Sequence, residues 1–271
     1  LAHGLPFVPP VAVRVGDAGD YADASVIVIT AGAKQRPGET RPDLLRRNVL
    51  VVNAIMAEIA ARESPAVVVI VTNPVDLLTR TAIQATGWDN GRVFGSGTVL
   101  DSARLRYLIS RSSGINVQNI HAYVLGEHGD SQVAAWSITN IAGMPIDRYC
   151  PLCGVCPEGQ WKEHKERLIQ EVRQSAYHII DYKGATNFAV GLALVRIVGA
   201  VLRNERRILT VSTLLTGQYG MDDVCLSVPC LVSARGVERI VEMDLAADDL
   251  AGLQRSGQAV RAAIRSLGDN P

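Results

Sequence analysis

The chain has 271 residues, of which 48% are hydrophobic and 20% charged, and its 27 basic residues balance its 27 acidic residues. A net charge of zero excludes nucleic-acid or anionic-membrane binding that is driven by bulk charge. The length and composition are those of one or two globular domains, which excludes disorder, collagen and coiled coil. Apolar runs are far shorter than the ~20 residues of a membrane-spanning helix. The odd count of five cysteines argues against a disulfide framework, so we expect a soluble protein of the reducing cytoplasm.

Short β-branched runs alternate with longer helical patterns through the first hundred residues. This alternation is typical of βαβ units and a parallel sheet. After Pro42, apolar residues recur every three or four positions, which indicates an amphipathic helix with proline in its first turn. The expected elements are strands at 11–15 (weak), 25–30, 67–71 and 93–94, and helices from 42 onward, at 75–85 and at 100–113.

The pattern changes after Ile120, where a short strand at 122–125 is followed by a polar run at 126–131. The mixture of long helices and strands beyond it indicates a second domain of the α+β class. We therefore expect two domains, 1–97 and 98–271, with the boundary near residue 98. The elements expected here are helices at 159–182, 185–202 and 247–267 and strands at 208–215 and 225–232.

Polar or glycine-rich loops follow three consecutive expected strands. They are Ala31-Gly32-Ala33, the loop that contains Asn73, and Gly95-Ser96-Gly97. Any one of them could be an ordinary turn, since glycine after a strand is usually only a turn. Ligands bind beyond the carboxyl ends of strands in open α/β sheets, so three such loops together predict a ligand-binding crevice.

Four side chains form a sharper set of candidates for chemistry: Arg41, Asp101, Arg104 and His128. Each also has an ordinary structural explanation. Asp101 could serve the positive end of a helix, and Arg104 could be a surface charge on the same helix face. His128 could be a hydrogen-bonded loop residue and Arg41 a solvated one. The residue types alone leave these alternatives open.

Several longer segments resemble those of a known family. In order and spacing they are similar to the signature segments of bacterial L-lactate dehydrogenases, in the lactate/malate dehydrogenase superfamily, and the resemblance runs essentially from end to end. It implies an α/β fold, with a Rossmann-type parallel sheet followed by an α+β substrate domain. The matching segments are AGAKQRPGETR at 31–41, TNPVD at 72–76, GSGTVLDSAR at 95–104, GEHGDS at 126–131, KGAT at 183–186 and LSVP at 226–229.

The resemblance implies reversible reduction of pyruvate to L-lactate with NADH, the terminal step of fermentative glycolysis. His128 would exchange a proton with the substrate oxygen, and Asp101 would orient and stabilise its imidazolium. Arg104 would bind the substrate carboxylate, and Arg41, on a loop hinged near Gly38, would polarise the carbonyl. Substrate-binding residues would be Gln35, Arg41, Asn73, Asp101, Arg104 and Thr186, and NAD-binding residues Gly32, Ala33, Val71, Thr72, Asn73 and Ser96.

Substrate choice is expected to depend on Gln35. The resemblance implies that related malate dehydrogenases carry arginine there, because oxaloacetate brings a second carboxylate and a buried unpaired charge is costly. A neutral glutamine favours the methyl group of pyruvate, with Thr186 at the far wall. Arg36 is adjacent, so malate dehydrogenase stays an alternative, as does a dehydrogenase of another 2-hydroxy acid.

Two further positions suggest regulation. Arg106 and His121 match the pair that, in allosteric bacterial lactate dehydrogenases, binds fructose 1,6-bisphosphate across a subunit interface. The resemblance therefore implies a homotetramer, a dimer of dimers, in which the effector offsets repulsion between facing cations. The alternative is an ordinary surface arginine and a strand histidine.

Cys150, Cys153 and Cys156 are close enough in sequence to invite a metal interpretation. Zinc sites usually take four ligands from two such pairs, and an iron–sulfur run needs a fourth cysteine that is absent at the expected spacing. We therefore expect no metal and interpret the segment as a thiol-containing connection, which is how similar loops look in clostridial-type lactate dehydrogenases.

One family feature does not occur in the sequence. The first βαβ unit of a dinucleotide-binding domain carries G-x-G-x-x-G followed about 20 positions later by an acidic residue, and this sequence does not contain that motif with its acidic partner. The expectation is an NAD-binding domain that lacks its first βαβ unit and exposes two apolar strand edges. Two hypotheses follow: an incomplete record of a working lactate dehydrogenase, or a non-catalytic fragment unable to bind NAD.

Overall fold

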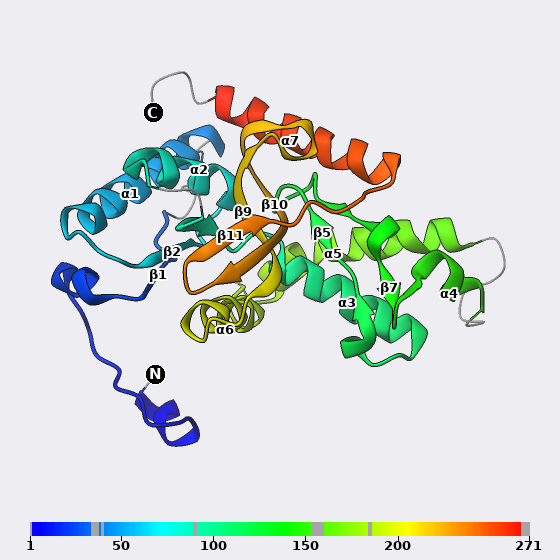
Figure 1. Cartoon of the computed structure of the whole chain (residues 1–271), viewed down its shortest axis with the longest axis horizontal. Coiled ribbons are helices and arrows are strands. Elements are labelled where there is room, and N and C mark those ends of the chain that lie inside the picture. Colours follow the sequence, from blue (N-terminus) through cyan, green and yellow to red (C-terminus); the bar gives the residue numbers. More distant parts are fainter. Residues whose placement is uncertain are drawn as a thin grey trace.

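A computed structural model describes residues 2–33, 38, 41–88, 91–152, 160–183 and 186–266 (Figure 1). The helices are α1 (Arg41–Ala61), α2 (Val75–Thr86), α3 (Val99–Ser113), α4 (Ile146–Leu152), α5 (Trp161–Lys183), α6 (Phe188–Leu202) and α7 (Ala247–Ser266), with short 3-10 turns at Ala2–Phe7, Ala18–Asp23, Val117–Asn119, Trp136–Ile138 and Gln218–Gly220. The strands are β1 (Val26–Ile29), β2 (Val67–Ile70), β3 (Val93–Gly95), β4 (Ile120–His121), β5 (Val124–Leu125), β6 (Val133–Ala134), β7 (Asn140–Ile141), β8 (Met144–Pro145), β9 (Arg207–Thr216), β10 (Asp222–Ser233) and β11 (Gly236–Ile240).

A six-stranded mixed sheet forms the centre of the fold, in the order β1-β2-β3-β9-β10-β11. The first three strands are parallel, as the βαβ pattern predicts, and β9, β10 and β11 continue the sheet in antiparallel fashion. The joint between the two parts is the pairing of Gly95 in β3 with Ser212 in β9. The central sheet is therefore built from both halves of the sequence.

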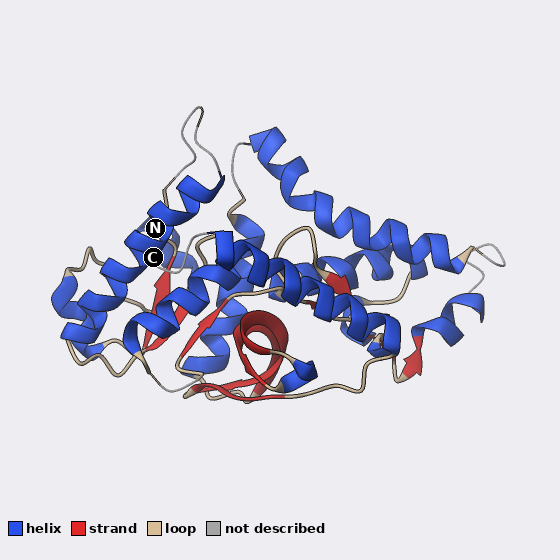
Figure 2. Cartoon of the chain, turned by 90° about the horizontal axis from the view of Figure 1, so that it is seen from above, coloured by secondary structure: helices blue, strands red, loops and turns tan. Residues whose placement is uncertain are grey.

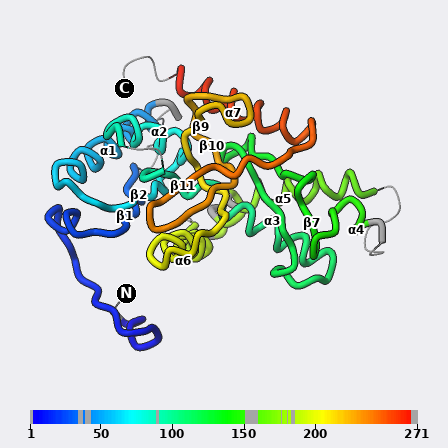
Figure 3. The backbone as a smooth tube through the Cα atoms, in the orientation of Figure 1, coloured from blue at the N-terminus to red at the C-terminus, as the bar shows by residue number. Residues whose placement is uncertain are grey.

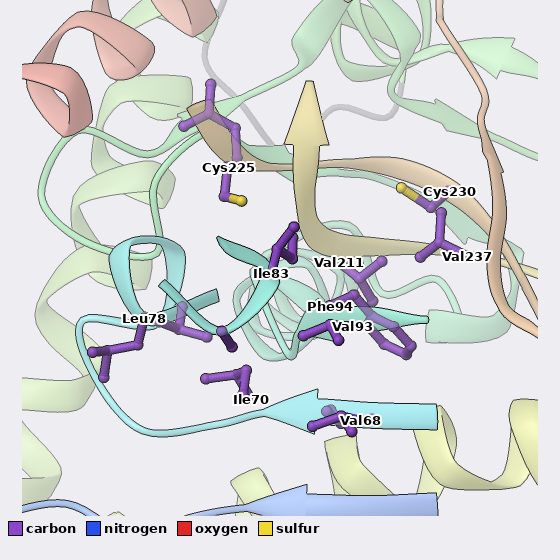
Figure 4. Packing of buried hydrophobic residues seen from close by; sticks show 14 of the residues in the cluster. Val68, Ile70, Leu78, Ile83, Val93, Phe94, Val211, Cys225, Cys230 and Val237 are labelled. Carbon is purple, nitrogen blue, oxygen red and sulfur yellow. The ribbon is translucent and has the colours of Figure 1, made fainter. Parts of the chain in front are cut away.

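The central strands are buried on both faces because helices cover the sheet on both sides. All four residues of β2 are buried, as are the last ten of β10. Figure 4 shows side chains of β2, β3 and β9 converging in one core around Phe94, which is completely buried. Burial of this kind contributes about 25 cal/mol per Å² of apolar surface, so this core is the main stabilising element of the sheet.

Helices cover the sheet. α2 and α7 contact β10 from one side, and α6 contacts β10 and β1 from the other, below the sheet in Figure 1. Figure 2 shows the long strands in the lower middle of the molecule, with helices above them and to the left. The positive φ of Gly87 (61°) and Gly114 (72°) ends α2 and α3 with left-handed caps, which glycine adopts without strain.

The second lobe packs α3 against α5 and the short strands β4 and β5, and α4 contacts β7 and β8. Its core is a separate apolar cluster centred on Leu105, Ile109, Ile120 and Val172. No helix of the described part of the chain is long and apolar enough to cross a membrane.

Most expected elements form within a few residues of their expected bounds, and the α/β fold class is confirmed. The strand at 11–15 is wrong: these residues pair with no strand among those described, and Val15 is 96% exposed. The tube in Figure 3 shows this segment leading away from the body of the molecule. Isolated β-branched runs do not form strands without a neighbour to pair with. β11, β6 to β8 and α4 were not predicted.

Candidate active site

The loops after β1 and β2 are tied together by Asn48 of α1, which is 3% exposed. Its side-chain oxygen accepts a hydrogen bond from the main-chain nitrogen of Ala33 at 2.8 Å, and its amide nitrogen donates to the carbonyl of Asn73 at 3.1 Å. A Cβ atom at Gly32 would lie 2.5 Å from Cγ2 of Thr72. Glycine is therefore required there for the two loops to approach each other.

A cavity of about 120 Å³ opens beyond the carboxyl ends of β2 and β3. It combines apolar walls with a few polar groups, the usual composition of a small-molecule site. Four residues predicted for substrate binding or catalysis line it: Asn73, Arg104, His128 and Thr186. Val71 and Ser96, which were predicted to bind NAD, line it as well, and Asn73 was predicted for both roles. The lining residues are Val71, Asn73, Ser96, Gly97, Leu100, Arg104, His128, Thr186, Val190 and Ala193.

Asp101 holds both cationic side chains of the site. Its Oδ2 lies 2.6 Å from Nδ1 of His128, and its Oδ1 accepts a hydrogen bond from Nη1 of Arg104 at 3.0 Å. The Asp101 side chain is 2% exposed, whereas that of His128 is 26% exposed and faces the cavity. A carboxylate on one ring nitrogen leaves the other nitrogen available to exchange a proton with a ligand.

Asp101 and His128 each stabilise the charged form of the other. Burial by itself would raise the pKa of Asp101, but the hydrogen bond and the charge of His128, followed by Arg104, outweigh it and the pKa is lowered. Burial by itself would lower the pKa of His128, but Asp101 outweighs it, with a further contribution from Asp76, and the pKa is raised. The geometry thus favours an imidazolium next to a carboxylate, which can act as an acid near neutral pH.

The loop that carries His128 is anchored from two sides. Gly126 exchanges two main-chain hydrogen bonds of 2.9 Å with Ser227 of β10, and the nitrogen of Glu127 donates to Oγ of Ser256 on α7 at 2.8 Å. Gly126 has φ of 91°, and a Cβ there would lie 2.5 Å from the Ser256 hydroxyl. This anchoring holds the histidine main chain on rigid elements, as precise catalytic geometry requires.

Other predicted residues lie elsewhere. Arg106 is half-buried on α3, and His121 is exposed on β4, which packs against α3. Gln35 lies outside the described residues, as do Cys153 and Cys156, and of Arg41 the structure describes only the main chain at the start of α1. Cys150 is buried on α4, and the described residues include no cluster of metal-ligating side chains.

Comparison with known protein families gives matches along nearly the whole chain. The sequence profile of the lactate/malate dehydrogenase NAD-binding domain matches residues 1–95, and that of the family's alpha/beta C-terminal domain matches residues 98–269. The chain belongs to the lactate/malate dehydrogenase family. It is an enzyme of this family, and NAD is its cofactor.

Relatives within this family share about half of their residues with the chain. The L-lactate dehydrogenase of Treponema denticola is 55% identical over 267 residues, which are 98% of this chain and 84% of that protein. The L-lactate dehydrogenase of Acetivibrio thermocellus is 47% identical over 98% of this chain and 83% of its own length.

Solved structures of the family superpose closely. A lactate dehydrogenase from a Medee basin deep-sea metagenome library has a TM-score of 0.94 at 38% identity, covering 98% of this chain and 84% of that one. The minor L-lactate dehydrogenase of Enterococcus mundtii in its ligands-bound form has a TM-score of 0.92 at 35% identity, covering 99% of this chain and 84% of that one.

The described residues fit the nicotinamide end of the cofactor. The cavity sits where the parallel strands end, which is the place for a dinucleotide in this sheet type. Val71, Leu100 and Val190 give it apolar walls for a ring, while Asn73 and Ser96 supply polar groups. These residues would hold the ring beside His128.

Sequence reasoning missed Asn48 and Asp76 as parts of the site. Asn48 is a polar residue on the buried stripe of α1, and this interruption of the apolar repeat is the signal that could have revealed it. Asp76 belongs to the TNPVD segment, and its carboxylate accepts a hydrogen bond from the main-chain nitrogen of His128. No sequence signal connects it to a loop more than fifty residues away.

Proposed function

We propose that this protein is an NAD-dependent L-lactate dehydrogenase, which reduces pyruvate to L-lactate reversibly. The observation that carries the proposal is the composition of the cavity. Among its ten described lining residues, Arg104 is the single guanidinium, and it lies in the same pocket as the Asp101-paired His128. A guanidinium next to an acid suits a substrate that has a carboxylate next to a carbonyl, and the apolar walls suit a small methyl group.

The positions of His128, Asp101 and Arg104 support their chemical roles in the proposed reaction. NADH, when bound, supplies the hydride for the carbonyl carbon. His128 gives its proton to the carbonyl oxygen and takes it back in the reverse direction, and Asp101 stabilises the imidazolium between these events. Arg104 binds the carboxylate through two parallel hydrogen bonds. Arg41 polarises the carbonyl, a role that depends on a side chain outside the described part.

The test compares pyruvate with oxaloacetate by kcat/KM in NADH oxidation. We expect pyruvate to be the better substrate, and a ratio below one would reject the assignment in favour of malate dehydrogenase. The matched variant is Gln35→Arg, which adds the second guanidinium that oxaloacetate needs and should shift the ratio toward it. A series of longer 2-oxo acids separates lactate dehydrogenase from other 2-hydroxyacid dehydrogenases. NADH fluorescence with an intact mass of the same sample tests the alternative that the chain is a fragment unable to bind NAD.

Regulation by fructose 1,6-bisphosphate is a second part of the proposal. Burial lowers the pKa of the Arg106 guanidinium, and nearby Arg196 adds to that effect, so an anion bound there would relieve repulsion. The expected result is activation by the bisphosphate at low pyruvate, lost in Arg106→Gln and in His121→Gln. Activity that does not respond to the effector would refute this part.

We also propose a homotetramer in the cytoplasm. Exposed apolar side chains on α6 support subunit contacts: Leu192 is 73% and Val195 66% exposed. The free thiols of Cys225 and Cys230 fit a reducing compartment. Light scattering of the purified protein tests the assembly, and a monomer at micromolar concentration would contradict it.

A further inference from the structure

A second buried carboxylate lies behind the histidine, on a different element from Asp101. Asp76 is in the first turn of α2 and is 3% exposed. The preceding N-cap residue, Pro74, makes no side-chain hydrogen bond to the helix end. A carboxylate in the first turn is favoured by the helix dipole, which explains why an acidic residue is tolerated there.

The two oxygens of Asp76 join three parts of the fold. Oδ2 accepts a hydrogen bond from the main-chain nitrogen of His128 at 2.8 Å, and Oδ1 accepts one from Oγ of Ser212 at 2.6 Å. Ser212 is fully buried on β9 and pairs with Gly95 of β3, the strand that leads into the cavity. One side chain therefore connects a helix of the NAD-binding half, the central sheet and the loop of the histidine.

His128 is thus held by two carboxylates at two different points. Asp101 binds its ring nitrogen, and Asp76 binds its main chain. We propose that Asp76 is a positioning residue for the reaction, which fixes the main chain of His128 and favours the protonated form of its ring. The inference rests on the proposed function for its link to catalysis, but its effect on the histidine can be measured without turnover.

The electrostatics of Asp76 support a role beyond structure. Burial raises the pKa of Asp76 to about 6, although Ser212 and His128 act in the opposite direction. The other ionisable groups that face it are Glu127, on the same loop as His128, and the buried thiol of Cys225 on β10. Neither is a cation, so His128 is the partner of opposite charge. An ionised group held in so unfavourable a place is typical of functional sites.

The experiment is a titration of the five histidines by NMR in the 271-residue chain, with the His128 resonance assigned from its absence in His128→Gln. In Asp76→Asn the side chain keeps an oxygen that can accept the His128 N–H but loses its charge. We expect the protonation midpoint of His128 to fall by half a pH unit or more, which is about a threefold change in the protonation constant. An unchanged midpoint would overturn the inference.

A matched control is available on α7. Asp249 also lies in the first turn of its helix and accepts hydrogen bonds from a main-chain nitrogen and a serine hydroxyl, both of Ser137, at 2.8 and 2.6 Å. Asp249→Asn removes the same charge from the same kind of site without touching the histidine loop. It should leave the His128 midpoint in place, and an equal shift in this variant would overturn a specific role for Asp76.

Kinetics of the same variants separate positioning from charge. Asp76→Ala leaves the His128 N–H without an acceptor, so we expect kcat for pyruvate reduction to fall about 30-fold or more, against about threefold to tenfold in Asp76→Asn. If both Asp76→Ala and Asp76→Asn had the kcat of the wild type, the positioning role would be overturned. If the wild-type protein fails to reduce pyruvate, the proposed function fails, while the titration still decides the role of Asp76.

Discussion

Replacing Asp76 by asparagine should make the protein more stable while making it a poorer catalyst. The pKa of this carboxyl rises from an ordinary 3.8 to about 6 on folding, mainly because of burial. The folded state then holds more protons than the unfolded state between these values, so stability falls as pH rises through this range. The shift of 6 minus 3.8 corresponds to about 3 kcal/mol at 1.36 kcal/mol per unit, the cost of the ionised group above pH 6.

Asparagine is neutral at every pH and avoids this cost. We expect Asp76→Asn to exceed the wild type in free energy of unfolding by about 3 kcal/mol at pH 8 and by about half of that at pH 5. Urea unfolding at the two pH values, each measured as a difference between variant and wild type, checks the prediction. A difference that does not change with pH, or a less stable variant at pH 8, would refute the reasoning.

Three other predictions concern neighbouring parts of the site. Asp101→Asn removes the carboxylate that holds the imidazolium, so the pKa of His128 should fall and pyruvate reduction at pH 8 should slow about 100-fold or more. The pKa of Asp101 is lowered from 3.8 and that of His128 is raised from 6.5, so the stability that this pair contributes is complete between these two ordinary values. It is lost as pH rises through the folded pKa of His128, and a wild-type advantage over Asp101→Asn that grows with pH above about 6.5 would contradict this. Arg104→Lys replaces a planar fork by a point charge, so kcat/KM for pyruvate should fall about 100-fold in steady-state assays, and near-normal efficiency would exclude a bidentate contact. Gly97→Ala should lower the free energy of unfolding, measured by thermal unfolding, by about 3 kcal/mol, because the new Cβ would lie 2.6 Å from the Ser212 nitrogen. The control is Gly114→Ala, which has a positive φ but open space around it and should cost about 1 kcal/mol. Equal costs in the two variants would show that the close approach is unimportant.

The sequence predicts the parts of this fold whose signals are local. Buried strands such as β2 are continuous apolar runs, and α1 and α7 have regular helical periodicity, so both kinds of element could be predicted from their own residues. The strand expected at 11–15 has the right residue types but no described strand to pair with. β11 was missed because Glu238 and Arg239 give it a polar pattern, while its place is set by pairing with β10.

The same distinction between local and long-range signals applies to the residues of the site. Asp101, Arg104 and His128 could be selected because their segments resemble a family, and the structure brings them together: Arg104 and His128 line one cavity, and Asp101 contacts both from behind it. Asp76 could not, since an acidic residue in a first helical turn is ordinary and its partners, His128 and Ser212, come from distant segments. Long-range hydrogen bonds leave no periodic signal in a sequence, so structure was needed to find this contact.

The joint between β3 and β9 has a consequence for how the protein can fold. Gly95 pairs with Ser212, and Ser212 in turn binds Asp76, so the edge of the cofactor half is completed by residues made much later during synthesis. A contact between residues so far apart in sequence closes a long loop, and the chain loses conformational entropy before the contact can stabilise it, which slows folding. A nascent chain that has been synthesised only as far as β3 therefore has an unpaired edge on that strand. The main chain of His128 can be fixed in place only after the second half of the chain has been synthesised.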